Sequence, residues 1–290
     1  MTAAKLGAAL SFDAGRELAR VFAGVGAESG AAGDPYRRGP RTGFDVKMYA
    51  VAASVSAWVG PVELGLRATI DDATPGDDGD RPLTSVYDEA MLVGFGESHS
   101  AGTGELSLVY DGRHPTHRWI PAAAPSTGFY VRAAAAYTQG DASRTGSFST
   151  SRGTLEARRL FDLFRGDRVL SIGMRVEAVT ADATALPFDR LPGLGGPQRL
   201  RALARDELRD RSAAAGDVEY EWALGGSSRA YLFVETGAVQ PGLDDLAASQ
   251  LHLGFGGGLR LLTGAATSVR LQLAGSADGD LGFYLQLGAL

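Results

Sequence analysis

The sequence predicts an all-β protein that forms one antiparallel transmembrane β-barrel. Three observations favour this class: short runs that alternate apolar and polar residues, turn-forming clusters of Gly, Asp, Ser and Pro between them, and a composition of 40 glycines with only 21% charged residues. Many runs are close to the ~9–11 residues of a tilted spanning strand. No run reaches the ~18 consecutive apolar residues of a spanning helix. Because all-β barrels of this length form one unit, we expect a single domain over residues 1–290.

Fourteen segments are candidate strands. Single-chain bacterial barrels have an even number of strands, so we expect fourteen, with twelve and sixteen as alternatives. In chain order the candidates are residues 6–12, 20–28, 45–59, 62–70, 87–97, 104–111, 128–139, 154–164, 169–179, 217–224, 230–239, 251–262, 268–275 and 281–290.

The alternation is clearest in the carboxyl-terminal third of the chain. In the last candidate strand, Phe283, Leu285 and Leu287 share one face, opposite Tyr284 and Gln286. A soluble β-sandwich produces the same alternation. The glycine content and the long polar connections favour the membrane barrel over the sandwich.

The connections predict which ends of the strands lie together. Six stretches are long enough for extracellular loops or plugs, and the connections 225–228 and 263–267 are short, as inner turns usually are. Counting strands back from 180–212 places 112–127 at the short-turn end, whereas counting forward from the amino end places it at the other. One early candidate strand is therefore split, merged or missing. The six stretches are 29–44, 71–86, 112–127, 140–153, 180–212 and 240–250.

Charge and composition exclude some classes of function. The net charge of −6 and the pI near 5.3 argue against a nucleic-acid partner. Cysteine is absent, which fits an envelope protein and many cytosolic ones. The amino end, MTAAKLGAALSF, has an apolar core too short for a signal peptide, and no α/β modules precede the strands. We expect the chain to start at or inside the barrel, without periplasmic modules.

The long connection 180–212 has the features of a loop that folds back into the barrel. Gly195, Gly196 and Pro197 allow a tight reversal, and residues 199–211 then place five arginines among three acids. A connection of about 30 residues in a compact domain is usually functional or disordered. We expect residues 180–212 to form a lumenal plug.

Acidic side chains on the neighbouring strands predict where such a plug would dock. In residues 230–239, Leu232 and Val234 share a face, so Glu235 faces the other way, toward the lumen. By the same alternation Glu219 and Glu221 point inward from residues 217–224. Inward carboxylates need partners, and an arginine of the loop can supply charge-assisted hydrogen bonds.

The expected plug contains LGG, LRAL and ELRD, and strands reading EYEW and FVETG follow it. Upstream of LGG lie YDGR, PSTG and LPF. This ordered set of short motifs resembles the carboxyl-terminal barrel of the BamA/TamA outer-membrane assembly family, also called bacterial surface antigens. The resemblance covers roughly residues 104–290. In the order named, the motifs are residues 194–196, 200–203, 207–210, 219–222, 233–237, 110–113, 125–128 and 186–188.

The resemblance implies a lock between the loop and the barrel wall. Arg201 stands at the family's loop-tip arginine, and Glu235 is the acid that it meets, on a strand that also carries Phe233 and Gly237. Ala202 departs from the family's loop glycine, Leu203 departs from its aromatic residue, and the chain ends Gly-Ala-Leu instead of with an aromatic residue. The alternative is that the pair is an ordinary lumenal ion pair that only stiffens the barrel.

The resemblance also implies a function and a location. It implies a barrel in the bacterial outer membrane that assists insertion or translocation of other proteins, with outer-membrane lipids and unfolded client proteins as partners. In that family the seam between the first and last strands opens and templates client strands. The alternatives are an anchor or export barrel of a larger, for example lipase-like, protein, and a passive channel. We expect a monomeric barrel whose signal peptide is not part of this chain.

Other patterns in the chain have less specific explanations. His114 and His117 have a chelating spacing without a third ligand, and residues 71–80 are acidic without the calcium-loop pattern. The GFGGG at 254–258 is followed by no helix, so it predicts a bend or close packing of lumenal side chains. No serine lies in a nucleophile-elbow context. We therefore expect no catalytic residues, no metal and no cofactor.

Overall fold

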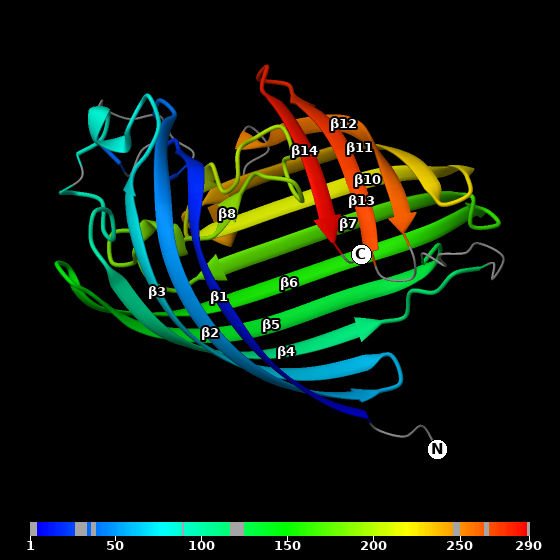
Figure 1. Cartoon of the computed structure of the whole chain (residues 1–290), viewed down its shortest axis with the longest axis horizontal. Helices are drawn as coiled ribbons and strands as arrows, with labels where there is room; N and C mark the ends of the chain where they lie inside the picture. Colours follow the sequence, from blue (N-terminus) through cyan, green and yellow to red (C-terminus); the bar gives the residue numbers. More distant parts are fainter. Residues whose placement is uncertain are drawn as a thin grey trace.

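A computed structural model describes residues 5–26, 34–35, 39–88, 90–116, 125–245, 250–263 and 267–288. In them, twelve strands form one antiparallel sheet in which each strand pairs with the next along the chain, from β1 to β14 (Figure 1). No helix in these ranges is long and apolar enough to span a membrane. The strands are β1 (Lys5–Phe22), β2 (Thr42–Val59), β3 (Val62–Asp77), β4 (His99–Asp111), β5 (Gly128–Ala142), β6 (Gly146–Phe164), β7 (Arg168–Val179), β10 (Ser212–Gly225), β11 (Ser228–Gln240), β12 (His252–Thr263), β13 (Thr267–Ser276) and β14 (Leu281–Gly288).

The expected fold class is confirmed, with twelve strands in place of the favoured fourteen. Candidates 6–12 and 20–28 are not two strands, because residues 5–22 form the single strand β1. Candidate 87–97 is not a strand. Gly94 and Gly96 have φ of 87° and 65°, which breaks an extended backbone, and Leu92 and Phe95 are buried beneath the loops.

The strand count also settles the positions of the loops. Residues 60–61, 165–167 and 226–227 make short turns at one end of the barrel, called here the inner end. The connection 112–127 leaves β4 at this same inner end, so its expected place among the outer loops is wrong. Stretch 140–153 lies mostly within β5 and β6, and β3 continues to Asp77, so those expected loops are shorter. The connections at 180–211 and 241–251 lie at the opposite, outer end.

Alternation along the strands separates a lipid-type face from a lumenal face. On β11, Leu232 and Val234 are 57% and 52% exposed, whereas Tyr231, Phe233 and Glu235 are at most 3% exposed. A period of two places alternate side chains on opposite faces of the sheet. The exposed face of the barrel is therefore apolar, and the polar side chains are gathered inside.

A hydrophobic cluster, called here the outer cap, lies at the outer ends of the strands between β1 and β7. Phe22 and Phe44 come from the outer ends of β1 and β2, and Phe188 comes from the loop that follows β7. The rings of Phe22 and Phe188, and those of Phe44 and Phe188, meet edge to face with centroids 5.3 and 5.1 Å apart. Leu92 and Phe95 from the connection after β3 complete this core. The cap buries apolar surface where the strands leave the sheet.

The sheet ends on two edge strands, β1 and β14. The chain of pairings runs from β1 to β14 without a pairing between these two strands among the described residues. β1 has 18 residues and β14 has eight, so the two edges differ in length by ten residues. Figure 1 shows them as the blue and red arrows, with β8 (Gly193–Leu194) of the long loop drawn between them.

Candidate functional site

The long loop after β7 folds into the lumen as a plug, defined here as residues 193–210. Its two ends pair as a hairpin of β8 and β9 (Leu208–Arg209). Gly195 and Gly196 have φ of 120° and 99°, and a Cβ on Gly195 would lie 2.0 Å from the Ala204 carbonyl oxygen. Only glycine accepts this reversal without strain. Pro197 follows them, and its carbonyl oxygen accepts a hydrogen bond of 2.7 Å from Gln272 on β13.

The plug tip is a tight turn whose side chains pack on the barrel wall. The positive φ of the tip falls on Leu200, at 48°, and not on Ala202. Ala202 is 5% exposed and packs in one apolar cluster with Tyr231 and Phe233 of β11. The departure from glycine at this position is therefore accommodated, because the backbone strain lies two residues earlier.

Arg201 reaches into the acidic wall of the lumen. Its Nε lies 3.4 Å from Glu235 Oε2, and its backbone N–H donates a hydrogen bond to Glu235 Oε1. Nη1 donates to Glu219 Oε2 at 3.2 Å, and the guanidinium lies 3.8 Å above the ring of Phe233. Arg201 is 2% exposed. The structure thus brings together four of the side chains that the sequence singled out, namely Arg201, Glu219, Phe233 and Glu235.

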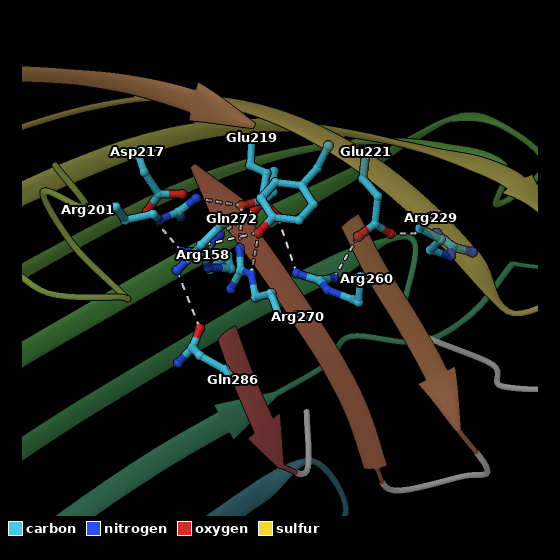
Figure 2. A network of polar contacts seen from close by, with 12 residues as sticks. Arg158, Arg201, Asp217, Glu219, Glu221, Arg229, Arg260, Arg270, Gln272 and Gln286 are labelled. Atoms are coloured by element: carbon cyan, nitrogen blue, oxygen red, sulfur yellow. Dashed lines mark hydrogen bonds and ion pairs between the residues drawn. The ribbon is translucent and has the colours of Figure 1, made fainter. Parts of the chain in front are cut away.

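Glu219 joins the plug to the two strands nearest the carboxyl-terminal edge. Besides Arg201, it accepts from Arg270 Nη2 at 2.8 Å and from Arg260 Nη2 at 3.4 Å (Figure 2). Glu221 does not contact Arg201 and instead pairs with Arg260 and Arg229, each at 2.6 Å. The acids of β10 therefore organise one ionic network that runs from the plug tip toward the inner end.

A row of inward glycines on β12 makes room for this network. A Cβ on Gly256 would lie 2.6 Å from Phe233 Cζ, and one on Gly258 would lie 2.5 Å from Tyr231 Oη. The rings of Tyr231 and Phe233 lie nearly parallel, with an interplanar angle of 30°. The GFGGG stretch therefore lets the two rings lie flat on the sheet, where the plug arginine covers one of them. This is the close packing of lumenal side chains that the sequence predicted.

The plug contacts the carboxyl-terminal edge strand directly. Tyr284 Oη on β14 donates to the Leu203 carbonyl oxygen at 2.9 Å. A Cβ on Gly282 would lie 2.0 Å from the Arg201 carbonyl oxygen, so the backbone of the plug tip rests on this strand. The absence of a side chain at Gly282 is what permits the approach.

Ionic contacts connect the same plug to the amino-terminal edge. Arg20 on β1 pairs with Asp206 at 2.5 Å. Arg41, just before β2, pairs with Glu207 of the plug at 2.5 Å and with Asp280, just before β14, at 2.6 Å. The plug therefore bridges both edges of the sheet, although the two edge strands are not paired with each other.

The base of the plug is anchored in the outer cap. Arg209 is 1% exposed, and its guanidinium lies 5.8 Å from the ring centroids of both Phe44 and Phe188. His99 Nε2 lies 3.1 Å from Asp189 Oδ2. Burial raises the pKa of Asp189, but the hydrogen bond and charge of His99 and the charges of Arg190 and Arg209 outweigh it and hold that pKa below its usual value.

Other singled-out residues lie away from the lock. Gly237 faces the plug base, and a Cβ there would lie 3.0 Å from Leu194 Cδ1. His114 Nδ1 lies 3.0 Å from the Gly112 carbonyl oxygen, and His117 lies outside the described residues. No group of three His, Asp or Glu residues in the described ranges could hold a metal ion.

The sequence reasoning missed much of the network around the plug. Strand alternation places Arg260, Arg270 and Tyr284 on the lumenal faces of β12, β13 and β14, but it does not predict that they contact Glu219 or the plug. Nothing in the local sequence marks Arg20 or Arg41, because their partners lie 186 and 166 residues away along the chain.

Comparison with known proteins supports the fold. No protein-family model and no curated protein matches the chain. BamA from Haemophilus ducreyi lacking POTRA domains 1–3 has a TM-score of 0.56 at 12% identity, covering 85% of this chain and 54% of that one. CdiB from Acinetobacter baumannii has a TM-score of 0.45 at 13% identity (86% and 52% covered), and the NalP translocator domain from Neisseria meningitidis has 0.40 at 10% (98% and 88% covered).

The likeness to BamA confirms, at the level of fold, the resemblance that the sequence motifs indicated. The chain has the fold of a BamA-type barrel. It spans about half the length of the BamA and CdiB chains.

Proposed function

We propose that this barrel assists the insertion or translocation of other proteins at the bacterial outer membrane. In this proposal the edge between β1 and β14 is the working surface, and the plug is its brace. The observation that carries the proposal is the sheet order, which ends on two edge strands that are joined through the plug. The partners are outer-membrane lipids and unfolded outer-membrane proteins, and no covalent chemistry is involved.

An open strand edge in a membrane has a specific physical consequence. Backbone N–H and C=O groups without partners are costly in a hydrocarbon environment, so an exposed edge readily captures another strand. β1 is 18 residues long and β14 only eight, so even complete pairing with β14 leaves ten residues of β1 without a partner on that side. A client strand can supply the missing hydrogen bonds.

Side-chain exposure agrees with this view of the edges. Leu6 and Leu10 on β1 are 81% and 78% exposed, and Leu281 on β14 is 80% exposed. Leu232, on the interior strand β11, is 57% exposed. The edge residues lack a neighbouring strand on one side, which leaves apolar surface that a client strand or lipid would cover.

The plug is placed to set how far the edges separate. It bonds to β1 through Arg20 and to β14 through Tyr284, and Arg41 bridges it to Asp280. Several weak contacts on each edge can be exchanged for client pairing without unfolding the rest of the sheet. The ionic lock at Arg201 then keeps the plug in the lumen while the edges rearrange.

The test is client folding in liposomes. The barrel is reconstituted, and the rate at which a simple unfolded outer-membrane protein inserts is compared with empty liposomes and with an unrelated barrel. Acceleration supports the proposal. No acceleration by a folded barrel contradicts it and favours an anchor, an export barrel or a passive channel.

A pair of proline variants tests the role of the β1 edge. Successive N–H groups of an antiparallel strand point to opposite sides, so of Ala8 and Ala9 one donates toward β2 and the other faces the open edge. Proline at the edge-facing position removes a templating donor and is tolerated in an edge strand. It should slow client insertion in a stable barrel, whereas the other proline should destabilise β1–β2 pairing. Client insertion at the native rate by the variant with the edge-facing proline would contradict templating by β1.

A further inference from the structure

Below the plug tip lies a lumenal cavity of about 510 Å³. It extends from Arg199 and Arg201 of the plug to Arg113 and Gly288 at the inner end of the barrel. The plug lies on its outer side. The cavity volume falls within the range of small-molecule sites in proteins.

Charged side chains line much of this cavity. Seven arginines and five carboxylates line it, and Arg113 and Arg175 also pair with Asp111 and Glu177, two carboxylates outside the lining. Six of the seven arginines therefore have a carboxylate partner.

Arg199 is the exception among these seven arginines. Its guanidinium has no hydrogen bond or ion pair with any residue in the described part of the chain, although Arg175 and the carboxylates of Glu156, Glu177 and Asp206 lie within electrostatic range. By contrast, Arg158 on β6 pairs with Asp217 at 2.8 Å, and Arg175 on β7 pairs with Glu177 at 2.8 Å. One arginine with uncommitted donors therefore lines the same cavity as the paired arginines.

We propose that this cavity binds a small organic anion through a carboxylate or phosphate group, with Arg199 as the principal ligand. The five N–H donors of a guanidinium match the oxygens of both groups in a bidentate geometry. Gln198 and Gln286 line the cavity beside the arginines and can donate further hydrogen bonds. Leu160 and Val169, both buried, add apolar wall for the rest of the molecule. The site lies in the lumen, where the edge strand β14 contributes Gln286 and Gly288 to its lining, and the proposal does not rest on the proposed function.

The test is calorimetric titration of the full chain in detergent with inorganic phosphate, glycerol phosphate and citrate at constant ionic strength. Three variants accompany the native chain. Arg199→Gln removes the proposed ligand, Arg199→Lys keeps its charge, and Arg205→Gln makes the same charge change at an exposed position of the same loop that does not line the cavity.

Saturable binding of at least one probe is expected, weakened at least about tenfold by Arg199→Gln, since a hydrogen bond to a charged group contributes about 1.5–3 kcal/mol. Arg199→Lys should retain part of the affinity, and Arg205→Gln should retain all of it. Tighter binding of glycerol phosphate than of inorganic phosphate points to a lipid headgroup, and the reverse order points to a free solute. No binding of any probe, equal binding by chloride, or native affinity in Arg199→Gln would overturn the proposal.

Discussion

Replacing Arg201 with alanine tests how the plug is held in the lumen. The change leaves Glu235, whose side chain is 2% exposed, without a cationic side-chain partner in the described part of the chain. Glu219 is less affected, because it keeps Arg270 at 2.8 Å and Arg260 at 3.4 Å. The variant also removes the guanidinium from the ring of Phe233. The plug tip should therefore leave its position more often.

The magnitude follows from these contacts. Breaking a buried ion pair by removing one partner costs about 3–5 kcal/mol, and the polar cavity beside Glu235 places this case near the lower value. About 3 kcal/mol corresponds to roughly a hundredfold rise in the population of the released plug. The coupling of Arg201 to Glu235 should be about 2 kcal/mol, and its coupling to Glu219 below about 1 kcal/mol, because Glu219 has other partners.

The assay uses the absence of cysteine from the chain. A thiol introduced by Ala202→Cys lies at a position that is 5% exposed, so its modification rate reports release of the plug. Arg201→Ala and Glu235→Gln should each raise the rate, and the double variant should raise it by less than their product. Unchanged rates in Arg201→Ala, or effects of the two substitutions that simply multiply, would refute the lock between Arg201 and Glu235.

Three further predictions concern the edges and the outer cap. Gly282→Ala should raise the rate of thiol labelling at position 202 at least about tenfold, because the new Cβ would lie 2.0 Å from the Arg201 carbonyl oxygen. Gly288→Ala on the same strand is the control: its Cβ meets nothing within 4 Å, so the labelling rate should stay unchanged. Arg41→Gln should lower stability to thermal unfolding by about 1 kcal/mol at low salt and by less at high salt, because the half-exposed Arg41 bridges Glu207 and Asp280. Equal losses of stability at both salt concentrations would contradict an ionic bridge. Burial raises the pKa of Glu97, but hydrogen bonds from the backbone of Arg144 and from other donors outweigh burial and hold this pKa below its usual value. The stabilisation by the Glu97 carboxylate is therefore present above the usual pKa and is lost as pH falls through the lowered pKa. Protease cleavage within 78–98 should rise below about pH 4, and the Glu97→Gln variant should not show this rise.

Strand prediction from the sequence was most accurate in the carboxyl-terminal half. There, candidates 217–224, 230–239 and 268–275 fall within β10, β11 and β13. Local alternation is a reliable signal for strands with one apolar and one polar face. It failed at 87–97, where the apolar residues Tyr87, Leu92 and Phe95 pack into the outer cap instead of a sheet. Burial under loops is a tertiary property that the local pattern does not encode.

Some features of the candidate site were likewise predicted from the sequence, and others were not. Inward positions for Glu219 and Glu235, and the reversal at Gly195, follow from strand period and backbone sterics, which act over a few residues. The contact of Arg201 with both acids was expected from the family resemblance combined with that alternation. The positive φ at Leu200, which accommodates Ala202, had no signal in the sequence.

By itself, the sequence determined the class of fold, the face on which each strand residue lies and the loop that enters the lumen, because these depend on periods of two and on turn residues within short windows. Only the tertiary structure decided which strands form the edges, how Arg20, Arg41 and Tyr284 attach the plug to them, and which lumenal arginine stays uncommitted. Those outcomes depend on pairings between residues far apart in the chain. Whether such contacts form depends on the shape of the whole barrel, which no local sequence pattern predicts.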